Sequence, residues 1–499
     1  MKNFTALLLF LLLSPILTAR TIQVSPGGPH GTLETAAAEA APGDTILFRA
    51  GVYAGGDHVS GLQGTRDAWI TITVAPGEEA VLSGGSNAWQ LSDPAWVRIS
   101  GFILEEQTGN GLNIDDGGTY DTPAHHIIIE RCTWRGIAAS GNNDLLKMSG
   151  VDSFEVRNCT FLNGAAGGSM IDMVGCHNGI FTDNRFERGG SNSIQAKGGT
   201  RHIRIERNTF IDGGQRTLNI GGSTGLEFFR PLGANYESSD IHVYSNTFVG
   251  SDAPIAFVGT VNSTVVNNTI WLPHRWAIRI LQETDDPPFL QCGDNTFRNN
   301  IVVVGNAAAN PTINIGGNTR PQSFTFSNNL WYNTENPGWS GPNLPVTESA
   351  GIVGSNPRLI SPPGTMTPGS GSPAIGNGFT VAEPVLDYLG RPFTTPRSIG
   401  AVEGNMPTTS VERDAAAGAR LRLEPQRGSR FMMAGATLPH EGVVEVMLYD
   451  MRGTRCWSYR ERHAAGEVTV QVPLDKLPAG AYLCVLLCDG TSLARMVGR

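Results

Sequence analysis

A repeat of about two dozen residues runs through the middle of the chain. Short segments of alternating apolar and polar residues begin at Leu146, Ile171, Ile194 and Leu218, at steps of 25, 23 and 24 residues. Related segments begin at residues 112, 255, 278 and 313. Alternation favours β-strands, and a fixed period of this length is typical of solenoids. The repeat predicts an all-β solenoid in which each unit forms one coil.

A second short segment in each repeat carries asparagine or cysteine at a fixed place. It reads RCTW at Arg131, NCTF at Asn158, NRF at Asn184, and NTF or NTI at residues 208, 246 and 268. Asparagine suits a turn whose side-chain amides bond to the next repeat. Leucine-rich repeats need a different leucine spacing, and propeller blades need about four strands and a longer period. Stacked β coils are therefore the preferred architecture.

The first 19 residues have a lysine, an apolar run and small residues near Ala19, which is the pattern of a cleaved secretory signal. We expect an exported protein, secreted or held at the outer cell surface, with no membrane span because no later apolar run reaches the ~18 residues required. The formal net charge of −9 argues against nucleic acid as a partner.

The segment from Thr21 to Gly404 resembles the right-handed parallel β-helix proteins of the pectate-lyase-like superfamily. GTLETAAAEAAPGDTILFRAGVY resembles their opening, with a short amphipathic helix that caps the first coil, and GSPAIGNG, LDYLGRP and SIGAVEG resemble their last coils. The resemblance implies a β-helix over residues 20–404.

The remaining residues predict a linker and a second domain. Residues 405–418 are polar and rich in alanine, and residues 419–499 show short alternating strands that suit a small β-sandwich. YDMRG and LPAGAY resemble two stretches of the C-terminal sorting domain of type IX secretion, which implies the secretion machinery as a partner. An immunoglobulin-like module that faces carbohydrate is the alternative. We expect a monomer.

In a parallel stack, equivalent residues of neighbouring coils lie ~4.8 Å apart, so columns of outward side chains can be read from the sequence. One column runs through Asn113, Lys147, Asp172, Gln195, Asn219, Ala256, Arg279 and Asn314, and the next through Asp115, Ser149, Val174, Lys197, Gly221, Val258, Leu281 and Gly316. Lys197 is thus expected beside Gln195 and Gly221 on a polar floor, where a linear polymer could bind. The pair Lys147 and Asp172 reads as an ion pair between coils.

Two features suggest a site around this floor. The loop after Gly222 is about 13 residues longer than the period predicts, and it contains Arg230, Tyr236 and Glu237. PHRWAIRILQE places His274, Trp276, Arg279 and Glu283 around one strand. The predicted substrate-binding residues are Lys147, Asp172, Gln195, Asn219, Arg230, Trp276 and Glu283.

β-Elimination from a uronic acid needs a base, a group that neutralises the carboxylate, and a proton donor to the leaving oxygen. Lys197 is the candidate base, provided that neighbouring cations favour its neutral form. Arg216, Arg230 or Arg279 would hold the carboxylate, and Tyr236 or His274 would donate the proton. A glycosidase needs two carboxyl groups ~5 to 9.5 Å apart, whereas Asp172 and Glu283 are four coils apart, or ~19 Å.

IQAKGGTRHIRIERNTF resembles the segment of polysaccharide lyase family 6 in which Ile-Ser-Asn-Lys-Ser carries the catalytic lysine, and that residue falls on Lys197. The family's next coil reads Leu-Thr-Leu-Arg-His-Gly, but Gly221 and Gly222 stand here at the Arg-His positions. Its acidic calcium ligands are replaced by Gly190 and Asn192. We therefore expect no cofactor, with calcium the one alternative.

The sequence predicts a secreted, polysaccharide lyase-like protein that cleaves an acidic, uronate-containing polysaccharide by β-elimination. Two alternatives stay open: a carbohydrate-binding or cell-surface β-helix protein without catalysis, and a glycoside hydrolase that uses loop carboxylates such as Glu237.

Overall fold

The computed structural model describes residues 19–119, 121–137, 140–404, 420–425, 431–438, 441–450, 455–474, 477, 481–488 and 491–498. Most of the predicted leader and the whole predicted linker lie outside these residues. The chain divides into two compact units, residues 1–405 and 406–499, and each is described by itself. No helix among the described residues is long and apolar enough to cross a membrane.

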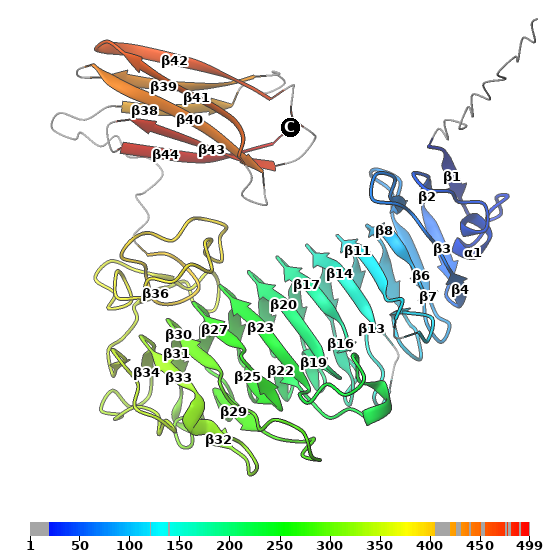
Figure 1. The fold of residues 1–499 in the computed structure, drawn as a ribbon, viewed down its shortest axis with the longest axis horizontal. Coiled ribbons are helices and arrows are strands. Elements are labelled where there is room, and N and C mark those ends of the chain that lie inside the picture. The colour runs from blue at the N-terminus through cyan, green and yellow to red at the C-terminus, as the bar shows by residue number, and fades with distance from the viewer. Residues whose placement is uncertain are drawn as a thin grey trace, which may run out of the picture. The chain divides into compact units, whose positions relative to one another are not determined.

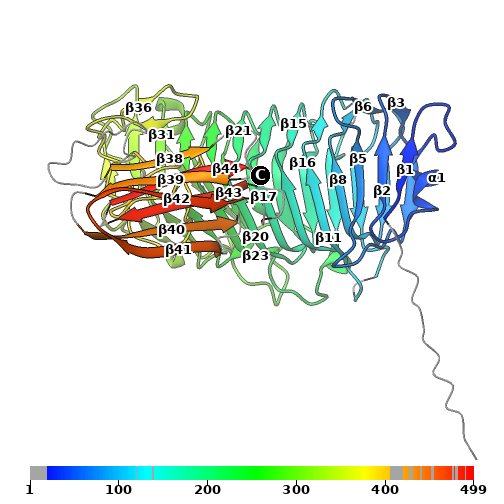
Figure 2. The ribbon, with the colours of Figure 1, turned by 90° about the horizontal axis from the view of Figure 1, so that it is seen from above.

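The first unit is a right-handed parallel β-helix whose three long sheets run along its axis (Figures 1 and 2). Sheet A contains β1 Thr21–Val24, β2 Thr45–Phe48, β5 Ile70–Val74, β8 Ala95–Ser100, β11 Ala124–Glu130, β14 Val151–Arg157, β17 His177–Thr182, β20 Thr200–Glu206, β23 Ser238–Tyr244, β26 Thr260–Val261, β27 Thr264–Val266, β30 Thr296–Arg298 and β33 Thr325–Ser327.

Sheet B contains β3 Gly51–Ala54, β6 Ala80–Ser83, β9 Ile103–Glu105, β12 Thr133–Trp134, β15 Thr160–Leu162, β18 Arg185–Glu187, β21 Thr209–Ile211, β24 Thr247–Val249, β28 Thr269–Trp271, β31 Ile301–Val304, β34 Leu330–Asn333 and β35 Ile352–Val353. Sheet C contains β4 Asp57–Ser60, β7 Trp89–Ser92, β10 Leu112–Asp115, β13 Leu146–Ser149, β16 Ser169–Val174, β19 Asn192–Lys197, β22 Arg216–Gly221, β25 Ile255–Val258, β29 Ile278–Leu281 and β32 Ile313–Ile315. All the strands that the repeat predicted from residue 112 to residue 313 lie in sheet C.

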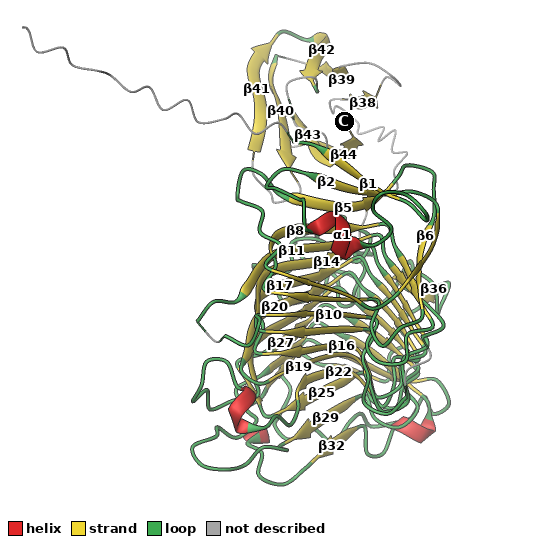
Figure 3. Ribbon diagram, turned by 90° about the vertical axis from the view of Figure 1, so that its right-hand side faces the viewer, coloured by secondary structure: helices red, strands yellow, loops and turns green. Residues whose placement is uncertain are grey.

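Short helices and one hairpin complete this unit. The helix α1 Leu33–Ala37 buries Leu33 and Ala36 and contacts β1, β2 and β4, which confirms the predicted cap on the first coil. Three single-turn helices lie in loops: η1 Leu226–Phe228, η2 Asn306–Ala308 and η3 Pro321–Ser323 (Figure 3). The strands β36 Leu359–Ile360 and β37 Thr367–Pro368 pair in antiparallel fashion.

The interior of the coils explains the recurring asparagine and phenylalanine. Asn184, Asn208, Asn246, Asn268, Asn300 and Asn329 form a buried ladder, in which the side-chain oxygen of each asparagine after the first accepts bonds from the backbone and the amide of the preceding one. Beside it, the rings of Trp134, Phe161, Phe186, Phe210 and Phe248 stack at centroid distances of 4.4 to 4.9 Å. These ladders fix the register of neighbouring coils, as the sequence predicted for the asparagines.

The second unit has two antiparallel sheets. One contains β38 Arg420–Pro425, β39 Phe431–Leu438 and β42 Gly466–Pro473, and the other β40 Gly442–Asp450, β41 Arg455–His463, β43 Ala481–Cys488 and β44 Thr491–Gly498. Buried side chains of both sheets, such as Val472 and Leu448, belong to one apolar core. This arrangement is the predicted β-sandwich.

Candidate functional site

The outward face of sheet C forms the polar floor that the sequence predicted. Asn113, Lys147, Asp172, Gln195, Asn219, Ala256, Arg279 and Asn314 follow one another as direct partners across eight strands. In the second column, Asp115, Ser149, Val174 and Lys197 are likewise in register. The alternation of inward and outward side chains therefore placed this surface correctly.

One position of the second column is wrong, because the register shifts between β19 and β22. Ala196, and not Lys197, is the partner of Gly221. The residue beside Lys197 is Gly222, with a φ of +153°. A Cβ atom on Gly222 would lie 2.6 Å from Nε2 of Gln195 and 3.4 Å from Cβ of Lys197. Glycine here lets the backbone lie close to the side chains of Gln195 and Lys197.

Lys197 belongs to a cluster of two lysines and two buried aspartates, which we call the central cluster: Asp144, Lys147, Asp172 and Lys197. The Nζ atom of Lys197 lies 3.5 Å from Oδ1 of Asp172, whose other oxygen accepts a bond from Lys147. Lys147 also lies 3.4 Å from Oδ2 of Asp144. The predicted ion pair between Lys147 and Asp172 is present, but it is one part of a larger network.

Asp144 is the residue of this cluster that sequence reasoning missed. It lies two residues before the strand β13, at the position that Ser169, Asn192 and Arg216 take in the next three coils. Its Oδ1 accepts a bond from the backbone N–H of Ser169 at 2.8 Å. These four residues form a third column. The sequence offered a signal for it, since each of them stands two residues before the first inward apolar residue of its strand.

Burial and charge set the protonation of the central cluster. Burial, and then the negative charge of Asp172, raise the pKa of the Asp144 carboxyl group from 3.8 to about 6. Burial lowers the pKa of the Lys147 ammonium, but the charges of Asp172 and Asp144 outweigh that effect, so the pKa is raised. The net charge of the cluster therefore changes near pH 6, where Asp144 titrates.

The surroundings of Lys197 differ from those that the prediction required. The prediction called for neighbouring cations that favour a neutral amine, but the charged group in contact with its ammonium is the carboxylate of Asp172. Oδ1 of Asp172 is buried and accepts no hydrogen bond among the described residues. Lys197 is the more exposed member of this pair, at 15% against 3% for the Asp172 side chain.

Gln195 and Asn219 lie in the floor as predicted. The side-chain oxygen of Gln195 accepts a bond from the hydroxyl of Ser169 at 3.2 Å. Asn219 is buried and lies 3.4 Å from Nη1 of Arg216. The other terminal nitrogen of Arg216 donates to Glu283 at 2.6 Å, so these two predicted residues bind each other across the floor.

Arg279 lies too far along the axis to hold the carboxylate of a sugar that Lys197 attacks. Its coil is separated from that of Gln195 by the coils of Asn219 and Ala256, three steps or ~14 Å. Its guanidinium lies 4.6 Å from the ring centroid of Trp276, and Nε donates to Asn314 at 2.9 Å. This separation weighs against the role predicted for Arg279 as a clamp at Lys197, which stays a prediction.

Arg230 is an anchor of the long loop and not a free substrate ligand. Its two terminal nitrogens bind both carboxylate oxygens of Asp152, at 2.7 and 2.8 Å, and one of them also binds the carbonyl oxygen of Gly175. Only 8% of the residue is exposed. The role in substrate binding is wrong for this residue because its guanidinium is fully engaged within the fold.

Glu237 closes the same loop. It is completely buried, and its carboxylate accepts bonds from the backbone N–H groups of Gly198 and Thr224 and from the hydroxyls of Thr224 and Thr284. The loop therefore lies against the turn that follows Lys197. Because its four partners hold the carboxylate inside the protein, Glu237 does not face the floor as a hydrolytic acid would.

The two predicted proton donors lie in different places. Tyr236 is half-buried and directly precedes Glu237, which binds the residue after Lys197. His274 lies before β29, on the edge of sheet C where the strands begin, whereas Lys197 ends its strand. There it faces Asp212 and Asp252 at 3.5 and 3.8 Å, beside a hollow of about 230 Å³. His274 is therefore not brought to Lys197.

No group of three or more histidine, cysteine, aspartate or glutamate side chains in the described part of the chain is arranged to hold a metal ion. At the place of the acidic calcium ligands, Asn192 lies next to Ser169 and Arg216. On the floor, Asp144, Asp172 and Glu283 are bound to lysine or arginine side chains instead.

Comparisons with known proteins agree with this fold. The family model of the right-handed β-helix region matches residues 89–270. An alginate lyase from Paenibacillus sp. str. FPU-7 is 19% identical, with a TM-score of 0.40, over 67% of this chain and 99% of that one. Pectate lyase Pel9A is 14% identical, with a TM-score of 0.48, over 78% and 98%.

A lacto-N-biosidase from Eubacterium ramulus is 11% identical, with a TM-score of 0.33, over 67% of each chain. No curated protein sequence matches this chain. At these identities the likenesses concern the fold alone.

Proposed function

We propose that this chain binds an acidic, uronate-containing polysaccharide along the outward face of sheet C and cleaves it by β-elimination, with Lys197 as the base. The observation that carries the proposal is the central cluster. It places a partly exposed lysine on a polar floor, in contact with a buried carboxylate oxygen that has no hydrogen-bond donor among the described residues. Such coupled acids and amines are typical of functional sites.

The reaction assigns a task to each group. Lys197 takes the proton next to the sugar carboxylate, the electron pair forms a carbon–carbon double bond, and the glycosidic oxygen leaves with its bonding pair. That oxygen needs a proton, for which Tyr236 is the candidate because its neighbour Glu237 binds the turn after Lys197. Gln195 offers its amide nitrogen to the sugar carboxylate, and glycine at position 222 lets that amide lie beside Lys197.

An absorbance screen for unsaturated uronate products on alginate, pectate and chondroitin tests this proposal. We expect product from the wild type and a loss of about 10²- to 10⁴-fold in turnover for Lys197→Ala, with binding nearly unchanged, because a general base contributes mainly in the transition state. Lys197→Arg should not restore activity, since a guanidinium keeps its proton. Arg185→Ala, in sheet B, is the control and should keep full activity.

A binding protein without catalysis is the second candidate, and the ion pair between Lys197 and Asp172 favours it because a carboxylate of the protein already engages the ammonium. This candidate predicts no product from the wild type on any acidic glycan and weaker glycan binding by Lys197→Ala. Full turnover in Lys197→Ala would exclude the elimination mechanism given above.

A hydrolase has less support from the geometry. Glu237 is held by four hydrogen bonds, and Asp144 and Asp172 are both about 3% exposed and share the ammonium of Lys147. A hydrolase that used these three residues would have no carboxyl group free for the glycosidic oxygen or for water.

We further propose that the protein is exported and that the second unit serves delivery to the cell surface. The separate core of that unit supports the idea, because a domain with its own core can be removed without loss of the other. A chain that ends at residue 405 should fold and keep its activity, and should fail to reach the surface in a host with type IX secretion. An unfolded product would assign the unit a structural role instead.

A further inference from the structure

A group of cationic and aromatic side chains lies on the floor away from Lys197. Arg275 and Arg279 both lie over the ring of Trp276, with guanidinium carbons 3.9 and 4.6 Å from its centroid. Asn314, one coil further, accepts a bond from Nε of Arg279. Ala256 precedes Arg279 in the column and is completely buried.

The positive charge of this group is not balanced by the fold. Among the described residues, no carboxylate forms an ion pair with Arg275 or Arg279, and the nearby Glu283 is bonded to Arg216. Burial, and then the positive charge of Arg216, lower the pKa of the Arg279 guanidinium. Asp212 and Asp252 lie beside His274, the residue before Arg275, but neither forms an ion pair with Arg275 or Arg279. An anion bound at these two guanidinium groups would supply the missing partner.

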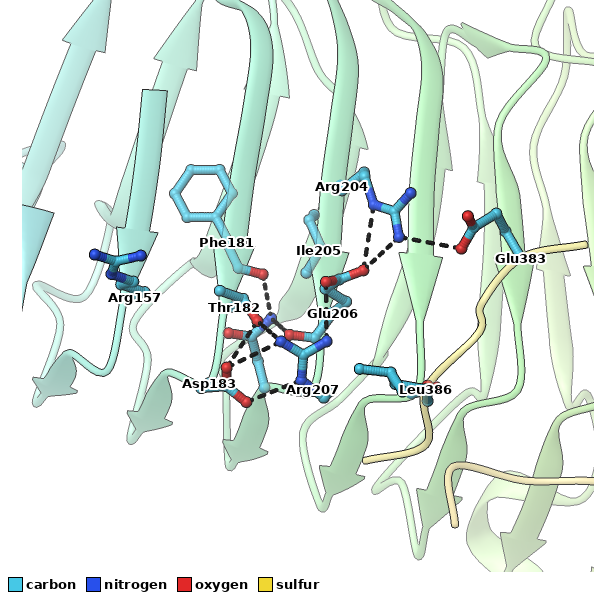
Figure 4. A network of polar contacts seen from close by, with 12 residues as sticks. Arg157, Phe181, Thr182, Asp183, Arg204, Ile205, Glu206, Arg207, Glu383 and Leu386 are labelled. Atoms are coloured by element: carbon cyan, nitrogen blue, oxygen red, sulfur yellow. Dashed lines mark hydrogen bonds and ion pairs between the residues drawn. The ribbon is translucent and has the colours of Figure 1, made fainter. Parts of the chain in front are cut away.

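Two arginines at the strand β20 of sheet A show the contrast. Arg204 and Arg207 bind Glu206, and they also bind Glu383 and Asp183 respectively (Figure 4). Their guanidinium groups are satisfied within the protein. The terminal nitrogens of Arg279 have no such partner in the described part of the chain, and its stacking on Trp276 orients the planar group that binds carboxylates in bidentate fashion.

We propose that Arg279, Arg275 and Trp276 form a second binding subsite, the distal subsite, for the anionic group of a sugar unit other than the one beside Lys197. The proposal rests on the proposed function, since it assumes that an acidic polysaccharide lies along the floor. The separation of three coils, ~14 Å, means that one sugar cannot occupy both places. The ligand is thus a polymer with repeated anionic groups, and short oligomers fill only one of the two places.

The test is calorimetric binding of uronate oligosaccharides of defined length to the intact chain. We expect Arg279→Gln to weaken binding of a hexasaccharide by about 10- to 100-fold, the range of a hydrogen bond between charged groups. Binding of a disaccharide should change less. Arg279→Lys should recover only part of the loss, because an ammonium lacks the bidentate geometry.

Arg298→Gln is a matched control. Like Arg279, Arg298 is half-buried, and its Nε donates to a side-chain oxygen, here that of Ser327. Its guanidinium carbon lies 4.6 Å from the ring centroid of Phe379. It belongs to sheet A, away from the floor. Its replacement should leave the binding of every oligomer unchanged.

Equal hexasaccharide affinity of the wild type and Arg279→Gln would overturn the distal subsite, as would a wild type that binds no anionic oligomer. A neutral oligomer of the same length should bind weakly and without dependence on Arg279. A sulfated oligomer without uronate distinguishes the two anions: Arg279-dependent binding of that oligomer in preference to the uronate would assign the subsite to sulfate esters.

The absorbance assay separates this proposal from the proposed function. A wild type that binds the hexasaccharide through Arg279 and yields no unsaturated product keeps the subsite and excludes elimination. If the wild type cleaves the polymer and Arg279→Gln has the same preference for chain length as the wild type, elimination is supported and the distal subsite is excluded.

Discussion

Replacing Asp144 by asparagine should make the stability of the β-helix less sensitive to pH. The folded protein raises the pKa of Asp144 from 3.8 to about 6, so the native state holds this proton more tightly than the unfolded chain does. The stability due to this group is therefore complete below about pH 4 and is lost as pH rises through about 6. Asparagine keeps an acceptor for the N–H of Ser169 and does not titrate.

The magnitude follows from the shift of about 2 units, at about 1.4 kcal/mol per unit. The wild type should lose stability relative to Asp144→Asn as the pH rises from 4 to 8. We expect the free energy of unfolding of the variant to gain about 2 to 3 kcal/mol on that of the wild type over this range. The Asp144 side chain is 3% exposed, so solvent screening does not reduce this value. Lys147 retains Asp172 as its partner in the variant.

Urea unfolding at several pH values measures this difference, with the fluorescence of the buried Trp89, Trp134 and Trp331 as the signal of the first unit. Ser149→Ala, on the same strand as Lys147, adds and removes no titrating group, and its difference from the wild type should not depend on pH. A constant difference between Asp144→Asn and the wild type from pH 4 to pH 8 would refute the reasoning.

Three further predictions concern the parts that support the floor. Asn246→Ala should destabilise the β-helix by about 2 to 6 kcal/mol in urea unfolding, because two buried donors of Asn208 lose their acceptor, whereas the exposed Asn343→Ala should cost little. Arg230→Gln should expose the loop before Glu237 to limited proteolysis while the asparagine ladder stays intact, and unchanged cleavage would show that Asp152 is not its anchor. Gly222→Ala should impair glycan binding or turnover more than thermal stability, since the new Cβ would displace Gln195 at the floor; equal loss of both would contradict this role.

The sequence by itself determined the coil, because its signals are local and repeat. Alternation decided which side chains point outward, and the strand motif that recurs in each coil decided which of them are neighbours, so the column from Asn113 to Asn314 follows from the order of residues alone. The asparagine ladder follows from the same regularity, since one turn residue in each coil meets its own kind in the next.

Only the tertiary structure decided what these side chains do. Asp144 reaches Lys147 on its own coil, and the bulge in β22 moves Gly222, and not Gly221, next to Lys197. Arg230 lies 78 residues from Asp152 in the chain, so its engagement could not be read from spacing. The partners of long side chains and of loops of irregular length depend on which groups lie near them in space. The balance of charge at Lys197 and Arg279 depends on these contacts.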